Sequence, residues 1–479
     1  MSGSTESSGD FHDRRIASWL ALLTFATYAY FFAGGGWNQN AQFDLTRAIV
    51  ERHTFAIDAY AGNTGDVSYA NGHVYANKAP ALSWIAALPY AALHAVESDP
   101  DAALTFNVYL CTLLCVALPG ALIPAMLFTY ARRRGVERGW AAFVAAVVAL
   151  GTQLLPYATI FMTAVPCATL LLYALIGERR ALAGFAAGLA TAMNYLCAPA
   201  VLLFAFSRDG WKRFAAGAVI PLAAIAIYQR VCFGGFFTTS VAKTDPRFLT
   251  HGAPLGVLEM PSLDVLYYVT LSPYRGHFFF APILLMAIVG LLRWPERRAQ
   301  LAVAALSVVF IGFNVSFNGW TGGYGIGGRY LVPLIPLWGL ALLYARPRAL
   351  VGALAAISFA INFAAAAVDP QVSATIPRPL TQYLLPLLIR GRISPRVPLM
   401  PPWSADTFTG HTSVNRMTLD EPIVFRVHPP GSLQSEWASF NLGEPSFGAG
   451  DARSLIPIVL LLALGAAAIG WQVRRAPPS

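Results

Sequence analysis

The stretch AALTFNVYLCTLLCVALPGALIPAMLFTYARRRGVER, residues 102–138, decides the class of fold. It opens with an apolar run well beyond the roughly 18 residues at which a run becomes a candidate transmembrane helix. It ends in a basic cluster, and such clusters mark the cytoplasmic side of a membrane span. The same alternation recurs along the whole chain. We therefore predict an all-α polytopic membrane protein.

The composition agrees with this class. Of the 479 residues, 56% are hydrophobic and 12% are charged, and the mean hydropathy is +0.54, whereas soluble domains carry about 25% charged residues. The net charge of +9 comes from short clusters between apolar runs, so it indicates topology. We find no nucleic-acid-binding motif. The five cysteines lie in or beside apolar runs without a CxxC pattern, which indicates small buried side chains.

Basic clusters set the predicted topology. Seven of them are spaced along the chain: 14–15, 132–138, 179–180, 208–213, 293–298, 346–348 and 474–475. If all face the cytoplasm, an even number of spans separates each cluster from the next. Three apolar segments lie between the first two clusters, so one of them does not cross. We predict that 79–96, with Pro80, Pro89 and His94, is a helix lying in the membrane interface.

This parity gives about 12 transmembrane helices with both termini in the cytoplasm. The predicted spans are 16–33, 102–130, 140–158, 160–177, a short pair within 181–206 that breaks near Asn194, 212–231, 278–292, 299–317, 328–345, 349–368 and 454–473. The outside loops are 34–101, 232–277 and 369–453. The predicted domains are a disordered cytoplasmic tail at 1–15, a transmembrane domain at 16–368, an outside loop or subdomain at 369–453, and a last span with its tail at 454–479.

The first outside loop concentrates polar residues. Asp44, Arg47 and Glu51 fall on one stripe of a short predicted helix, where they could simply form salt bridges in solvent. Further along the loop come more side chains that can donate protons, accept them or carry charge: Asp58, Asp66, His73 and Lys78.

Two further motifs lie at the outer rim. TLSPYRGHFFFAP, Thr270 to Pro282, places Arg275 at the mouth of a span, where snorkelling to lipid headgroups is the plainer interpretation. NGWTGGYGIGGRYLVPLIP, Asn318 to Pro336, surrounds Tyr324 with glycines and then leads through Arg329 into a helix. A glycine-rich turn at a helix N-terminus suits an anion, and an arginine adds bidentate phosphate recognition. Carboxylates on one loop and cations on the others suit a lipid-phosphate substrate.

These motifs together resemble the GT-C superfamily of integral-membrane glycosyltransferases, in particular bacterial relatives of the protein O-mannosyltransferase and aminoarabinose-transferase type. The resemblance rests on FDLTRAIVE, VYANKAPALSW, SPYRGHFFFAP and WTGGYGIGGRYLVPLIP, in that order between residues 14 and 345. It implies a GT-C-like fold with interfacial helices in the first periplasmic loop. It also implies transfer of a sugar from a polyprenyl-phosphate donor to a lipid, glycan or protein acceptor at the periplasmic face of the bacterial inner membrane.

The resemblance also implies roles for individual residues. Asp44 corresponds to the catalytic base, and Asp66 is the candidate second carboxylate. Lys78 and Arg329 are expected at the donor phosphate, with Arg275 as a weaker ligand. His73 and Tyr324 complete the expected substrate-binding set. A divalent cation held by Asp44, Asp58 and Asp66 is left open, although no ligand spacing demands a metal.

Two other functions remain open. The chain departs from the family at Leu45 and Ala81, where relatives carry an acidic residue and a glycine, which leaves room for a non-catalytic protein that binds lipid-linked sugar. A 12-helix transporter also fits the topology. However, transporters usually place charges at the bilayer midplane and carry repeats, and neither feature is visible in this sequence.

Overall fold

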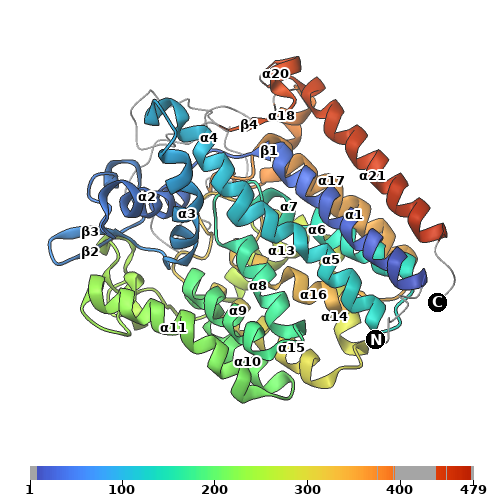
Figure 1. Ribbon diagram of the computed structural model, residues 1–479, viewed down its shortest axis with the longest axis horizontal. Coiled ribbons are helices and arrows are strands. Elements are labelled where there is room, and N and C mark those ends of the chain that lie inside the picture. Colours follow the sequence, from blue (N-terminus) through green and yellow to red (C-terminus); the bar gives the residue numbers. More distant parts are fainter. Residues whose placement is uncertain (1–7, 375, 392, 394–438, 449, 476–479) are drawn as a thin grey trace, which may run out of the picture.

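The computed structural model describes residues 8–374, 376–391, 393, 439–448 and 450–475. It is a bundle of helices with two short strand pairs (Figure 1). The helices of the first half are α1 (Ser8–Tyr30), α2 (Trp37–Arg52), α3 (Ala81–His94), α4 (Pro100–Thr112), α5 (Leu118–Arg133), α6 (Arg138–Leu150), α7 (Leu154–Tyr157), α8 (Ala164–Ile176), α9 (Arg180–Met193) and α10 (Ala198–Ser207). Those of the second half are α11 (Trp211–Phe233), α12 (Leu263–Thr270), α13 (His277–Phe280), α14 (Leu285–Arg293), α15 (Arg297–Ser316), α16 (Ile335–Leu342), α17 (Arg348–Val368), α18 (Leu385–Ile389), α20 (Glu444–Phe447) and α21 (Ile456–Arg475).

The prediction of an all-α membrane protein is confirmed. Within the described residues, five helices are long and apolar enough to cross a membrane: Ala103–Arg133, Trp211–Phe233, Arg297–Ser316, Arg348–Val368 and Ala452–Arg475. Shorter apolar helices occupy the other predicted spans, except the first. The first predicted span lies in α1, a 23-residue helix that begins with polar and charged residues. The predicted pair within 181–206 is α9 and α10, and Asn194 caps the turn between them. How many helices cross the bilayer stays a prediction.

One predicted boundary is wrong. Residues 8–15 were expected in a disordered tail, yet they form the first turns of α1. Their polarity favoured a disordered tail, but Asp13 is held by ion pairs to Arg132 and Arg138, at 2.8 Å and 2.6 Å. These tertiary contacts compensate for the weak helix preference of the polar residues. The predicted subdomain 369–453 lies largely outside the described residues.

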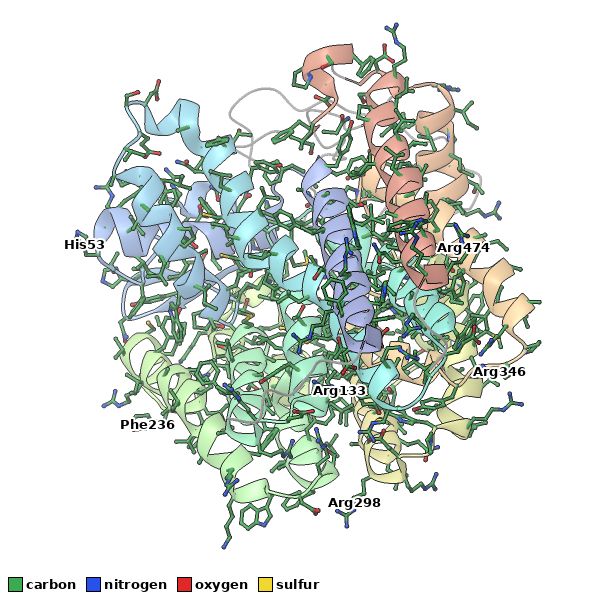
Figure 2. All side chains as sticks on the ribbon, turned by 45° about the vertical axis from the view of Figure 1, so that its right-hand side comes forward. His53, Arg133, Phe236, Arg298, Arg346 and Arg474 are labelled. Atoms are coloured by element: carbon green, nitrogen blue, oxygen red, sulfur yellow. The ribbon has the colours of Figure 1, made fainter. Side chains whose placement is uncertain are left out.

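The basic clusters meet at one end of the molecule, here called the basic end. Besides the pairs of Asp13, four ion pairs connect clusters far apart in sequence: Arg134–Glu296, Arg133–Glu178, Arg298–Asp209 and Arg348–Glu137. Helix α21, which carries the last cluster, packs against α1 and α6. Figure 2 shows the separation of this end from the loops, with His53 and Phe236 on the left and, toward the centre and right, Arg133, Arg298, Arg346 and Arg474. The clusters thus share one side, as the parity argument requires, and its assignment to the cytoplasm stays a prediction.

Close helix packing depends on small residues. Helices α9 and α11 approach so closely that a Cβ on Gly184 would lie 1.8 Å from the carbonyl oxygen of Phe214. A Cβ on Gly217 would lie 1.8 Å from the carbonyl oxygen of Ala181. Backbone contact through glycine and alanine is typical of helix pairs in membranes, where dispersion replaces the hydrophobic effect as the source of association.

The opposite side of the molecule, here called the loop end, is built from segments that connect the long helices. It comprises α2, the hairpin of β2 (Val67–Ala70) and β3 (His73–Ala76), and residues 240–248, 319–328 and 369–374. Strand β1 (Phe31–Phe32), which follows α1, pairs antiparallel with β4 (Phe440–Asn441). Figure 1 shows α2, β2 and β3 at the left, far from the start of α1 and the end of α21 at the lower right.

Helix α3 is the segment predicted to lie in the interface. It packs on α2 and α4, and the Tyr90 hydroxyl donates a 2.6 Å hydrogen bond to Glu51 of α2. The other side of α3 leaves Leu88 exposed. An apolar outward face suits lipid, and the orientation of α3 relative to the bilayer stays a prediction.

Candidate active site

Helix α2 carries Asp44 into the interior of the loop end. The Gln39 side chain caps the start of the helix by accepting from the Gly36 amide at 3.1 Å. Asp44 is fully buried, and its Oδ1 accepts a 3.2 Å hydrogen bond from the Nδ2 of Asn63. The other two residues of the predicted stripe pair with each other, because Arg47 lies 3.1 Å from Glu51. Asp44 is more deeply buried than this pair, whose side chains are 14% and 17% exposed.

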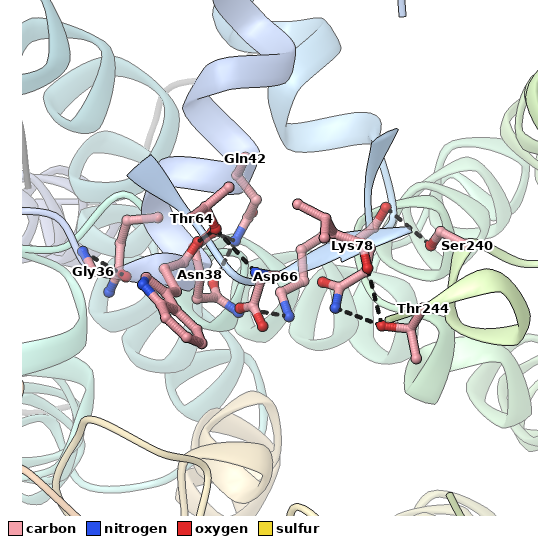
Figure 3. A network of polar contacts seen from close by, with 12 residues as sticks. Gly36, Asn38, Gln42, Thr64, Asp66, Lys78, Ser240 and Thr244 are labelled. Atoms are coloured by element: carbon pink, nitrogen blue, oxygen red, sulfur yellow. Dashed lines mark hydrogen bonds and ion pairs between the residues drawn. The ribbon is translucent and has the colours of Figure 1, made fainter. Parts of the chain in front are cut away.

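The β2–β3 hairpin brings Asp66 and Lys78 together. Its turn is Asn71-Gly72, both with positive φ, as a tight two-residue hairpin turn requires. Register places Val67 opposite Ala76, so the residues just beyond the strands come side by side. The Lys78 ammonium lies 2.9 Å from the Asp66 carboxylate, and both side chains are largely shielded from solvent (Figure 3).

Residues 240–248, here called the cover segment, pack across the base of the hairpin. Ser240 donates to the carbonyl oxygen of Lys78 at 3.3 Å, and Asn77 donates to the Thr244 hydroxyl at 2.9 Å (Figure 3). At its far end Phe248 meets the ring of Trp37, the first residue of α2, edge to face. The predicted middle outside loop therefore helps to enclose the Asp66–Lys78 pair.

The glycine-rich motif forms a compact loop, residues 319–328, here called the glycine loop. Arg275 anchors it: this side chain is 1% exposed and donates to the carbonyl oxygens of Gly323 (2.8 Å) and Val372 (3.1 Å), and also to that of Gly325. Such burial excludes snorkelling to headgroups. The guanidinium organises the backbone here, and its role at a phosphate stays a prediction.

Arg329 lies where the glycine loop enters a short 3₁₀ helix, Arg329–Leu334. Its aliphatic part folds back over Gly322, where an added Cβ would come within 2.9 Å of it. The side chain is half-buried, and its guanidinium lies near the Tyr330 ring and in electrostatic reach of Asp66. Lys78 thus pairs with Asp66 directly, and Arg329 lies within electrostatic reach of the same carboxylate.

Residues 369–374, here called the bridge segment, join the glycine loop to the start of α2. The Gly325 amide donates to the carbonyl oxygen of Val372 at 2.9 Å. On the other side Gln371 accepts from Gln39 at 2.9 Å and donates to the carbonyl oxygen of Gly34. The bridge segment thus fixes the position of the helix bearing Asp44 relative to the loop that precedes Arg329.

Asp369, at the start of the bridge segment, is a buried carboxyl group. It accepts from the Gln371 amide at 2.7 Å and from the Tyr383 hydroxyl at 2.9 Å. Burial raises the pKa of Asp369 to about 6, although both hydrogen bonds act in the opposite direction. Tyr324 lies in the same neighbourhood, where burial raises the pKa of its hydroxyl and Arg275 and Asp369 both act on it.

His73 is not brought to this cluster. It lies beside the hairpin turn, about three residue steps, or roughly 10 Å, along the strand from Ala76. Its Nδ1 lies 2.7 Å from Asp58, and both side chains are about half exposed. Among the described residues no group of three or more His, Cys, Asp or Glu side chains is arranged to hold a metal ion, and the divalent cation stays an open expectation.

Several polar residues of the cluster were not singled out from sequence. The hairpin itself had a signal, because Asn71-Gly72 between two short β-prone runs is a strong turn pattern. Asn40 and Asn63 had none, since their importance depends on contacts between α2 and the loop after it. Asp369 looked like an ordinary residue at the end of a span, and only the folded chain shows its burial.

Comparison with known proteins adds one likeness. No protein-family model and no curated protein matches the chain. Among solved structures, the chain is similar to ArnT from Cupriavidus metallidurans, whose crystal structure is bound to undecaprenyl phosphate. The alignment covers 79% of this chain and 70% of that chain, with a TM-score of 0.48 and 17% sequence identity. At this distance the likeness does not define chemistry, which is interpreted below from the site's own residues.

Proposed function

We propose that the chain is a membrane glycosyltransferase that moves a sugar from a polyprenyl-phosphate donor to a hydroxyl acceptor at the loop end. The observation that carries the proposal is the Lys78–Asp66 pair, with Arg329 within electrostatic reach, at the same loop end that buries Asp44. A phosphate on a lipid can take the place of Asp66 between the two cations, while Asp44 remains available as a base. The motifs that resemble the GT-C superfamily are the same ones that supply these residues.

The proposed reaction is a single displacement. The acceptor oxygen forms a bond to the anomeric carbon of the sugar, and the bond from that carbon to the phosphate oxygen breaks. The electron pair leaves with the polyprenyl phosphate, and the acceptor proton passes to the Asp44 carboxylate. Lys78 and Arg329 stabilise the charge that develops on the leaving phosphate.

The distribution of buried charge favours this chemistry over transport. Transporters usually hold charged groups at the bilayer midplane. Among the buried charged residues of the described chain, Arg138 lies at the basic end, and Asp44, Asp245 and Asp369 lie in segments of the loop end. Arg275 lies against the glycine loop, and Glu444 lies in α20, just after β4. Reactive groups at a membrane surface suit a substrate whose tail is in lipid and whose head is in water.

The test is a transfer assay with the purified full chain. Radiolabelled polyprenyl-phosphate sugars and a cell-envelope extract serve as donors and acceptors, and wild type is compared with Asp44→Asn. We expect transfer by wild type and a loss of at least about hundredfold in Asp44→Asn, because general-base catalysis contributes roughly 10²–10⁴-fold. Asp58→Asn is the matched control, since it removes a first-loop carboxylate that lies beside His73, outside the cluster.

Three outcomes would change the interpretation. Full activity in Asp44→Asn would remove Asp44 as the base. Equal losses in Asp44→Asn and Asp58→Asn would indicate a general effect of loop charge. Saturable donor binding without transfer by wild type would favour the non-catalytic relative that the departures at Leu45 and Ala81 left open.

A further inference from the structure

Next to Asp44 the loop end contains two buried amide oxygens that accept no hydrogen bond from any described residue. Asn40 lies one turn before Asp44 on α2, and its Nδ2 donates to the carbonyl oxygen of Asn63 at 2.7 Å. Asn63 in turn donates through Nδ2 to Asp44 at 3.2 Å. Asn40 is 0% exposed and Asn63 is 6% exposed. The Oδ1 atoms of both have no donor in the part of the chain that the structure describes.

The orientation of both amides follows from their neighbours. A backbone carbonyl oxygen and a carboxylate only accept hydrogen bonds, so Asn40 and Asn63 must present their NH₂ groups to them. Their Oδ1 atoms are then necessarily the groups left over. A buried acceptor without a donor costs folding free energy, and in native proteins such a group often points to an absent ligand or water.

We propose that Asn40, Asn63 and Asp44, here called the amide cradle, bind hydroxyl groups of a sugar or polyol substrate. Two neutral carbonyl oxygens and a carboxylate are three acceptors, so they match O–H donors and repel a phosphate. The cradle is thus complementary to the cationic pair Lys78 and Arg329. This inference deepens the proposed transferase function, because a hydroxyl held at Asp44 is placed beside the proposed base.

The ligand is a hydroxyl-bearing molecule and not a metal ion. Ca²⁺ takes about six to eight oxygens, usually with several carboxylates, and the cradle offers one carboxylate. No group of three metal-ligating acidic, His or Cys side chains occurs within the described ranges. The hydroxyls can come from the donor sugar or from the acceptor, and kinetics separates these two sources.

The first test measures binding without requiring turnover. The thermal unfolding midpoint of the full chain in detergent is recorded against pentoses and hexoses up to high millimolar concentration, with MgCl₂ and CaCl₂ as separate arms. We expect a saturable rise with at least one sugar in wild type, and at least a tenfold weaker response in Asn40→Leu. Asn362→Leu is the matched control, because Asn362 is a buried asparagine in α17 whose Oδ1 also accepts nothing among the described residues.

The second test uses the transfer assay. Asn40→Leu is expected to raise the KM of one substrate at least tenfold with a smaller change in kcat, and the substrate affected identifies the source of the hydroxyls. Should Asn40→Leu fail to fold, Asn40→Gln, which displaces the carbonyl oxygen by one methylene, takes its place. A purely structural asparagine would lower stability and leave KM unchanged, as Asn362→Leu should.

Clear results overturn the inference. The amide cradle is excluded if no sugar stabilises wild type, or if Asn40→Leu and Asn40→Gln respond to sugar as wild type does. Stabilisation by Mg²⁺ or Ca²⁺ alone, lost in Asn40→Leu, would make it a cation site. Sugar binding that depends on Asn40 in a protein without transferase activity would retain the cradle and reject the proposed function. Transfer with an unchanged KM in Asn40→Leu would reject the amide cradle and retain the proposed transferase function.

Discussion

The basic end and the loop end differ in how far their polar side chains are paired within the protein. At the basic end, charges from distant clusters neutralise one another, as in the pairs of Asp13 with Arg132 and Arg138. At the loop end, the Oδ1 atoms of Asn40 and Asn63 are buried and accept nothing from the described residues, and Lys78 pairs with Asp66 within electrostatic reach of Arg329. The first arrangement holds helices together. The second arrangement presents hydrogen-bond acceptors and cations with which a substrate can interact.

This difference predicts which substitutions lower stability and which lower activity. At the basic end they should lower stability and spare activity, because the charges are paired within the protein. At the loop end, substitution of Asn40 or Asn63 should lower activity with less effect on stability, because a buried acceptor without a donor among the described residues does not stabilise the fold.

Lys78→Met should reduce transfer activity by about 10²–10³-fold, the usual effect of removing one group that stabilises developing charge on a leaving group. Its thermal midpoint should fall modestly, because the partly shielded pair with Asp66 is lost. Lys243→Met is the matched control, since Lys243 is an exposed lysine of the cover segment, and it should retain activity. Comparable losses in both variants would show that net charge, not the position of Lys78, controls the rate.

Asp369→Asn should change how stability depends on pH. The folded pKa of about 6 exceeds the ordinary value of 3.8, so the folded state holds its proton more tightly than the unfolded state. Wild type therefore loses about 3 kcal/mol from this group as pH rises from about 3 to about 7, with most of the loss between the two pKa values. The measurement is unfolding of both proteins across this range. Identical pH profiles would show that Asp369 does not titrate there.

Asp13→Asn should lower the free energy of unfolding by about 1–3 kcal/mol, between the values for exposed and buried pairs, because it leaves two largely buried arginines without their carboxylate. Transfer activity per folded molecule should be retained. The exposed pair Arg298–Asp209 is the control, and Asp209→Asn should leave the unfolding midpoint unchanged. Loss of activity without loss of stability in Asp13→Asn would contradict the division between the ends.

The transmembrane helices could be predicted because their signal is local. Apolar runs such as 102–130 exceed the length of a span, and basic clusters mark their ends. The same rule located the basic end and identified 79–96 as a separate helix, observed as α3. It failed at residues 8–15, where ion pairs across the bundle extend α1 beyond its apolar part.

The candidate site could be predicted only in part. Asp44, Lys78 and Arg329 stand in motifs with recognisable neighbours, so their types and order were informative. The pairing of Lys78 with Asp66 depends on the register of a hairpin, and the amide cradle depends on one helix contacting the loop that follows it. Arg275 was expected at a phosphate, and its bonds to backbone oxygens arise from a fold that brings residues 323 and 372 together. Such contacts between distant segments leave no pattern in a single sequence.

The most direct test of the central claim measures the lipid product. Purified wild type is supplied with a polyprenyl-phosphate sugar and an envelope acceptor, and the released lipid is quantified beside the transferred sugar. We predict one polyprenyl phosphate for each sugar transferred, with both products reduced together in Asp44→Asn. Sugar that reaches the far side of a vesicle still attached to its lipid, with no polyprenyl phosphate released, would contradict the transferase and favour a transporter.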